Sequence, residues 1–140
     1  MSVLRRRSLL LLTSLVLMAG LTLALAREPI DREVFLVAHD MTFFEEGSSV
    51  PNPTLVVRAG ERVRLVLVNE DRGMLHDLSI EALDVLVPVL AGDGSRGWTV
   101  LEAPETPGRY EYVCTYHERL MRGVLQIVPA GRSSPSAPAS

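Results

Sequence analysis

The chain has 140 residues, with 14 Lys and Arg against 17 Asp and Glu, a formal net charge of −3, three histidines and one cysteine. This length suits one domain with one hydrophobic core and is too short for two. The single cysteine excludes an internal disulfide, and the acidic balance argues against nucleic acid as a partner.

The N-terminus has the features of an export signal. Arg5 to Arg7 are positive, residues 9–25 are almost wholly apolar, and Ala24-Leu25-Ala26 is a small-x-small cleavage sequence. We expect residues 1–26 to be a signal peptide, although the apolar run is long enough to be an uncleaved membrane anchor instead. Cleavage leaves 11 basic and 17 acidic residues, a formal charge of −6. The domain is therefore expected in the periplasm or on the outer face of the cytoplasmic membrane.

The chain beyond the leader reads as short strands separated by turns, without a long stretch of helical periodicity. The expected strands cover residues 34–37, 41–44, 54–58, 62–69, 76–80, 98–101, 110–114 and 123–128. Residues 85–88 are either another strand or an irregular crossing. The pattern predicts an all-β antiparallel sandwich or barrel of Greek-key type, with about seven to eight strands.

This domain is expected to occupy residues 27–129. Residues 130–140 are mostly Ser, Pro, Ala and Gly, a composition that cannot bury a core, so they are predicted to form a disordered tail.

The only cysteine lies close to a histidine and a methionine: Cys114, His117 and Met121. A period of two along residues 110–114 points Cys114 with the core-facing side chains at the end of the strand. His117 and Met121 then lie in the loop before the last strand, where thiolate, imidazole and thioether can converge. These ligand types favour copper, and two histidines, one cysteine and a weak axial methionine make a blue-copper set.

The set needs a second histidine, and only His39 and His76 remain. His76 is the better candidate, because it follows a turn at the start of a strand, and the polar–apolar alternation of residues 77–80 fixes its direction. His39 is interpreted as structural, since its place between two β-prone runs gives it no clear partner. Met41 and Met74 compete with Met121 for the axial position.

At these residues the chain resembles the cupredoxin family of blue copper proteins, whose small members include plastocyanin, azurin and amicyanin. The resemblance covers roughly residues 34–129. It rests on the loop from Cys114 through His117 to Met121, on His76 before an Asp-Leu-Ser-Ile strand, and on a predicted hairpin at residues 57–65. It implies a cupredoxin-like fold and one Cu(II)/Cu(I) ion, with Cys114 as thiolate, His76 and His117 as imidazoles, and Met121 as the axial contact.

Two features depart from the best-known members. The spacing of His117 and Met121 matches azurins, but the gap between Cys114 and His117 is shorter than theirs. The first histidine is followed by Asp77, where those members have an Asn that ties the ligand loops together. How rigidly the site is held and how its potential is tuned therefore stay open.

The resemblance implies an exported carrier of single electrons between unidentified redox partner proteins. Leu75 and Leu120 are the candidate docking patch beside the edge of His117. A monomer is expected, in contact with a membrane only if the N-terminal segment is retained. The alternative is a copper carrier that delivers or buffers copper for an exported oxidase, with Met41, Met74 or His39 joining a more exposed site.

An enzyme is not expected. Copper nitrite reductases and multicopper oxidases need further histidine-rich centres, which three histidines cannot build, and the binuclear copper centre of oxidase subunits needs two cysteines. A Cys114–His117 nucleophile lacks an oxyanion-hole signal and a third partner. A structural zinc site needs more thiolate or imidazole ligands than are free.

Overall fold

A computed structural model describes residues 29–92 and 94–131 of the chain. The predicted signal peptide and residues 132–140 of the predicted tail lie outside the described residues. Within the described part, none of the helical structure is long and apolar enough to cross a membrane.

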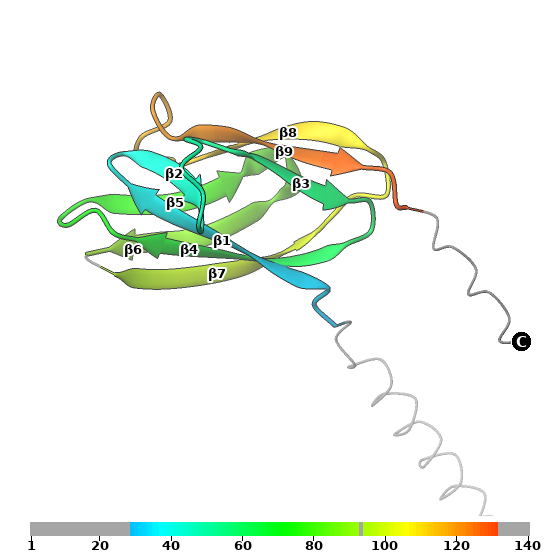
Figure 1. The fold of residues 1–140 in the computed structure, drawn as a ribbon, viewed down its shortest axis with the longest axis horizontal. Coiled ribbons are helices and arrows are strands. Elements are labelled where there is room, and N and C mark those ends of the chain that lie inside the picture. The colour runs from blue at the N-terminus through cyan, green and yellow to red at the C-terminus, as the bar shows by residue number, and fades with distance from the viewer. Residues whose placement is uncertain (1–28, 93, 132–140) are drawn as a thin grey trace, which may run out of the picture.

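The described residues form nine strands and one short 3₁₀ helix (Figure 1). In chain order they are β1 (Arg32–His39), β2 (Thr42–Glu45), β3 (Thr54–Arg58), β4 (Arg62–Asn69), β5 (Leu75–Ile80), η1 (Glu81–Leu83), β6 (Val85–Ala91), β7 (Ser95–Glu102), β8 (Gly108–Val113) and β9 (Arg122–Val128). The all-β class is confirmed. The undecided segment at residues 85–88 is a regular strand, which brings the number above the expected seven to eight.

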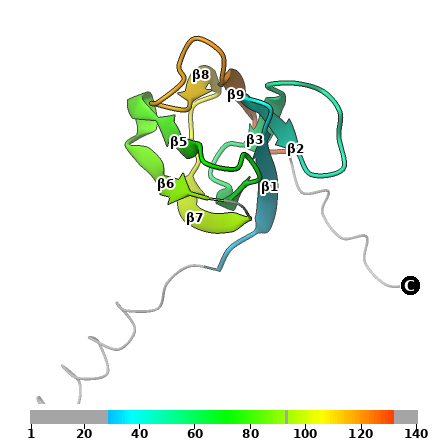
Figure 2. The same ribbon diagram turned by 90° about the vertical axis from the view of Figure 1, so that its left-hand side faces the viewer.

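The strands make two sheets that pack face to face (Figures 1 and 2). One sheet has the order β2-β1-β4-β7 and the other β3-β9-β8-β5-β6. Most strands point alternate residues inward, as in β4, where Val63, Leu65 and Leu67 are fully buried; Val66, between the last two, is buried as well. The core formed between the sheets includes Leu36, Phe43, Leu78, Leu101, Tyr112, Cys114, Met121 and Leu125.

The predicted antiparallel arrangement is wrong for two strand pairs. β1 pairs with β4 in parallel, and β3 pairs with β9 in parallel. The predicted hairpin at residues 57–65 is also not a hairpin, because β3 and β4 belong to different sheets. The turn at Ala59-Gly60-Glu61 is a corner between them: the Ala59 amide donates to Val128 O and the Gly60 amide to Ala103 O.

Candidate metal centre

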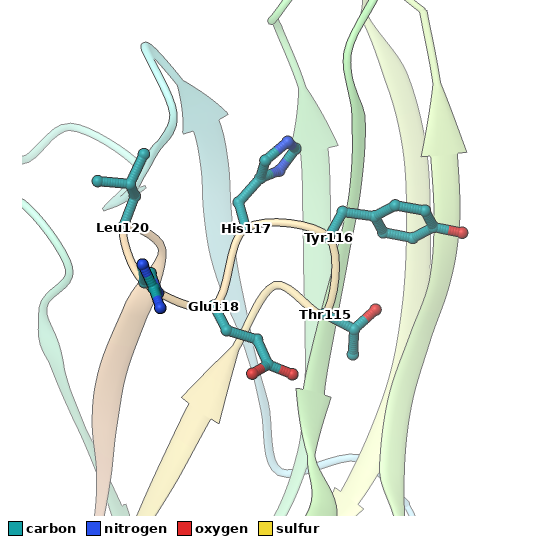
Figure 3. Close-up of a pocket in the computed structure, with 6 residues that line it drawn as sticks. Thr115, Tyr116, His117, Glu118 and Leu120 are labelled. Carbon is teal, nitrogen blue, oxygen red and sulfur yellow. The ribbon is translucent and has the colours of Figure 1, made fainter.

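The loop from Cys114 to Met121 is closed by its own backbone. The Cys114 amide donates to Met121 O at 2.9 Å, which joins the two ends of the loop between β8 and β9. Inside it, the His117 amide donates to Cys114 O, and His117 O accepts from the amides of Leu120 and Met121. His117 and Leu120 project to one side of this loop and Glu118 to the other (Figure 3). The spacing of Cys114, His117 and Met121 is therefore fixed by a hydrogen-bonded turn.

His76, at the start of β5, completes a cluster with the loop. Cys114 Sγ lies 3.7 Å from His76 Nδ1 and 3.6 Å from His117 Nδ1, and the two imidazole ring centroids are 5.0 Å apart. All three ligand atoms lie within 4.8 Å of one another. Met121 is fully buried in the same core cluster as Cys114. The predicted residues from two distant parts of the chain thus come together.

These distances fit a transition-metal ion held between the three groups. An ion about 2.3 Å from a thiolate sulfur and about 2.0–2.1 Å from an imidazole nitrogen, in tetrahedral to trigonal geometry, keeps those two atoms about 3.6–3.8 Å apart. The observed separations of 3.6 and 3.7 Å lie in that range. Soft sulfur combined with imidazole is the donor set that favours copper.

Asp77 ties His76's strand to the ligand loop. The register of β5 on β6 shifts between His76 and Leu78, so His76, Asp77 and Leu78 are all buried and the predicted alternation is interrupted at Asp77. Asp77 Oδ1 accepts from the Thr115 amide at 2.7 Å, and its Oδ2 accepts from the Thr115 hydroxyl. The aspartate therefore links the two ligand-bearing segments, the role that the resemblance assigns to an asparagine.

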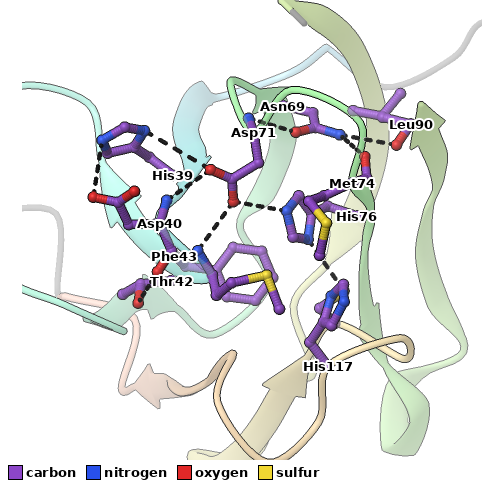
Figure 4. Close-up of polar contacts among 12 residues, drawn as sticks. His39, Asp40, Thr42, Phe43, Asn69, Asp71, Met74, His76, Leu90 and His117 are labelled. Carbon is purple, nitrogen blue, oxygen red and sulfur yellow. Dashed lines mark hydrogen bonds and ion pairs between the residues drawn. The ribbon is translucent and has the colours of Figure 1, made fainter. Parts of the chain in front are cut away.

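A second carboxylate contacts His76 from the outer side. Asp71 Oδ2 lies 2.9 Å from His76 Nε2 (Figure 4), whereas the other ring nitrogen, Nδ1, faces Cys114 Sγ. Burial by itself raises the pKa of Asp71, but hydrogen bonds from the Met41 and Asp40 amides and from His76 outweigh it, so the pKa lies below its usual value. Asp71 is therefore ionised at neutral pH.

Burial changes the proton affinity of two of the predicted ligands. Desolvation raises the pKa of the Cys114 thiol, so in the metal-free protein the thiol is protonated at neutral pH. Desolvation, followed by the proximity of His76, lowers the pKa of His117, which keeps that imidazole neutral. A metal ion has to displace the thiol proton, and it meets an imidazole that is already free to bind.

The cluster reaches solvent through His117, which is partly exposed, whereas His76 is fully buried. Exposed apolar side chains lie in the same loop and at the start of β5: Met74, Leu75, Tyr116 and Leu120, the last 58% exposed. Leu75 and Leu120, the two residues of the predicted docking patch, are both exposed.

His39 does not join the three-residue cluster. It forms a separate, more exposed group with Asp40 and Asp71, with His39 Nε2 3.3 Å from Asp40 Oδ2 and His39 Nδ1 4.0 Å from Asp71 Oδ1. The interpretation that His39 has no clear partner is therefore wrong. Sequence analysis also missed Asp71, because an aspartate in a turn is common and carries no sign of a buried partner.

Comparison with known proteins agrees with the fold. Residues 13–127 match the family described as the cupredoxin-like domain. Auracyanin B is 21% identical, with a TM-score of 0.56 over 74% of this chain and 94% of that chain. Auracyanin A, a "blue" copper protein from Chloroflexus aurantiacus, is 17% identical, with a TM-score of 0.53 over 69% and 98% of the two chains.

A third similar structure is the McoA multicopper oxidase from Aquifex aeolicus, which is 14% identical with a TM-score of 0.55. The match covers 72% of this chain but only 27% of the oxidase chain. No curated protein matches the sequence. At these identities the structural likenesses show the fold, and the family match covers most of the chain. Within that fold, His76, Cys114, His117 and Met121 have the arrangement of a type 1 copper site. The chain therefore belongs to the cupredoxin-like family.

Proposed function

We propose that this protein is an exported type 1 copper protein that carries single electrons between redox partner proteins and is not an enzyme. The observation that carries the proposal is the convergence of His76 Nδ1, Cys114 Sγ and His117 Nδ1 at metal-binding separations inside a cupredoxin-like fold. In this proposal Met121, buried beside Cys114, supplies the axial thioether. The bound copper ion would supply one-electron exchange between Cu(II) and Cu(I).

The chain contributes by holding these side chains in place. The loop ends are joined through Cys114 and Met121, Thr115 is bonded to Asp77, and the Asn52 side-chain amide donates to Leu120 O at 2.9 Å. Each bond ties the loop to itself or to another segment. Such a site changes little between two oxidation states, which favours rapid electron exchange.

His117 is the proposed point of electron entry and exit, because its ring reaches the surface while His76 does not. Met74, Leu75 and Leu120 are exposed, and they are the apolar side chains proposed to contact a partner protein. The acidic balance of the chain would attract a basic partner at low ionic strength. We expect the protein to act as a monomer.

Export is proposed from the sequence of residues 1–26. A signal peptide would release the domain into the periplasm or beyond, and an uncleaved segment would hold it at the outer face of the cytoplasmic membrane. Both routes place the domain in the same compartment.

The alternative, copper delivery, calls for an exposed and adaptable site from which copper leaves easily. Three of the four proposed ligands, His76, Cys114 and Met121, are fully buried. This burial favours electron transfer over delivery.

The proposal is tested by adding Cu(II) to the chain without residues 1–26 and recording its visible absorption. An intense blue thiolate-to-copper band that disappears on reduction is expected, and Cys114→Ser should abolish it. The matched control is His39→Gln, which removes a histidine outside the ligand group and should leave the band unchanged. A colourless protein that binds Cu(I) and passes it to a chelator would overturn electron transfer and support delivery.

A further inference from the structure

The carboxylate of Asp71 is the partly buried hydrogen-bond partner of a proposed copper ligand. His76 is fully buried, and its two ring nitrogens face different groups: Nδ1 lies 3.7 Å from Cys114 Sγ, and Nε2 lies 2.9 Å from Asp71 Oδ2. The Asp71 side chain is itself 12% exposed. An ionised carboxylate can only accept, so Nε2 carries the proton and Nδ1 keeps its lone pair for the metal.

A dedicated network holds Asp71 in this position. The amides of Asp40 and Met41 donate to Oδ1 and Oδ2 at 2.8 and 3.0 Å, and these two consecutive residues have positive φ angles of 48° and 56°. Neither is glycine, so the turn adopts an uncommon backbone conformation that directs both amides at one carboxylate. The aspartate therefore bridges the β1–β2 turn and the start of β5.

The other side of Asp71 is fixed by a buried asparagine. The Asp71 amide donates to Asn69 Oδ1 at 2.9 Å. The Asn69 side-chain amide in turn donates to Met74 O and Leu90 O, at 2.9 and 3.0 Å. The carboxylate is thus oriented by its own backbone as well as by the turn that it contacts.

We propose that Asp71 is a positioning residue that fixes the tautomer and orientation of His76 and lowers the reduction potential of the metal centre. The inference rests on the proposed function. A negative charge bonded to a ligand stabilises the more positive oxidised ion more than the reduced ion, because the attraction grows with the ion's charge. A hydrogen bond to a carboxylate also makes the imidazole a stronger electron donor, which acts in the same direction.

The competing explanation is that Asp71 acts only as a structural brace, that is, it holds two turns together without an electrostatic effect on the metal centre. The two roles differ in what a charge-neutral replacement does. Asp71→Asn keeps the shape, and its oxygen in the Oδ2 position still accepts from the Met41 amide and His76 Nε2, so only the bond from the Asp40 amide is lost together with the charge. A shift in potential without loss of the fold therefore separates electrostatic tuning from bracing.

The test is a redox titration of the copper-loaded protein against a dye of known potential. Asp71→Asn should shift the equilibrium toward the reduced protein at least tenfold, which is about 59 mV for one electron. The matched control is Asp40→Asn, which removes a charge from the β1–β2 turn that Asp71 contacts; its side chain is 86% exposed and contacts His39 rather than His76. The control should shift the equilibrium far less. Equal shifts in the two variants would overturn the inference.

A second measurement needs no variant. In the Cu(I)-loaded wild-type protein, ¹H–¹⁵N spectra should show a slowly exchanging Nε2 proton on His76, while that of partly exposed His117 exchanges rapidly. An unprotonated or freely exchanging His76 Nε2 would overturn the inference. A wild-type chain that shows no blue band overturns the proposed function and this inference with it, whereas a blue wild-type with an unshifted Asp71→Asn overturns this inference alone.

Discussion

Asp77 shows how one side chain can join two segments that are far apart in the sequence. It lies directly after His76 and accepts two hydrogen bonds from Thr115, the residue after Cys114. The bulge in β5 makes this possible, because it turns Asp77 inward together with its neighbours. The link keeps the His76 imidazole and the Cys114 thiol at a fixed separation.

Removing the Asp77 carboxylate should loosen the metal centre. Asp77→Ala leaves the Thr115 amide and hydroxyl without their partner, so we expect copper affinity to fall about 10–100-fold. Asp77→Asn should retain most of the affinity, because the amide oxygen can still accept from the Thr115 amide and the amide nitrogen can donate to the hydroxyl. The measurement is competition for copper with a chelator of known affinity. If the two variants lose the same affinity, the link does not depend on these hydrogen bonds.

The outcome for individual strands shows what sequence pattern can and cannot predict. The bounds predicted for β3 and β4 are confirmed, because residues 54–58 and 62–69 carry clear alternation or β-prone runs between turns. The partners of these strands were predicted wrongly. Alternation determines which side chains point inward, but it holds no information on whether a corner leads back to the same sheet or to the opposite one.

The sequence predicted the candidate site to a similar extent: it indicated the ligand residues but not the contact of Asp71 with His76. The short spacing of Cys114, His117 and Met121 predicts their convergence, because a closed turn can bring them together without help from the rest of the chain. His76 was found by elimination and by its place at the start of a strand. The contact between Asp71 and His76 depends on a turn with two positive φ angles at residues 40 and 41, which no sequence signal specifies.

The pairing of β8 with β9 depends on a glycine below a buried aromatic ring. Tyr112 and Gly123 are directly opposite in register, and a Cβ atom on Gly123 would lie 2.2 Å from both Cζ and Oη of Tyr112. The ring cannot easily move away, because its hydroxyl donates to Pro53 O at 2.6 Å and it packs against Phe43. The strand next to the ligand loop therefore accepts only glycine at this position.

Gly123→Ala should lower the free energy of unfolding of the metal-free protein by about 1–3 kcal/mol or more, because the methyl group overlaps the Tyr112 ring. Urea unfolding measures the change. The control is Gly108→Ala on the same strand pair, where the new Cβ would lie 3.3 Å from the partly exposed Tyr110 ring, a much milder contact. Equal losses in the two variants would show that the Tyr112 ring moves aside without cost.

At the scale of the whole molecule, the metal centre and the corner between the sheets stand at opposite ends of β4. Eight residues of strand span about 26 Å. Asn69, at one end of the strand, belongs to the hydrogen-bond network around Asp71. Glu61 lies just before the other end. Its carboxylate accepts hydrogen bonds from the Arg32 side chain at 2.7 Å and from the Arg58 amide at 2.8 Å. The contribution of the corner to the free energy of unfolding can therefore be measured in the metal-free protein.

Glu61 should make the metal-free protein sensitive to acid. Burial raises its pKa, but the hydrogen bonds from Arg32 and Arg58 outweigh burial, so the pKa in the folded protein lies below its usual value. A folded-state pKa below the unfolded-state value of about 4.3 means that the ionised group stabilises the fold above that pH. This contribution is lost as the pH falls through the folded-state pKa.

Urea unfolding of the metal-free chain and of Glu61→Gln, at pH 7 and near pH 3, checks this expectation. At pH 7 the variant should be less stable by about 1.5–3 kcal/mol, the usual contribution of hydrogen bonds to a charged group, and the difference should shrink in acid. Glu102→Gln, which removes a 73% exposed carboxylate paired with Arg62, should change little at either pH. A gap between wild type and Glu61→Gln that is the same at both pH values would contradict the assignment.

The distribution of the ligands along the chain also bears on the order in which the protein folds. The turn from Cys114 to Met121 is local and costs little entropy to close, whereas His76 is 38 residues away from Cys114. His76 meets the turn only when β5 docks on β8, where Ser79 pairs with Val113. Such long-range pairing is among the later and slower steps of folding. We therefore expect copper to enter a chain that has already folded, so that metal uptake is the last step of maturation rather than the first.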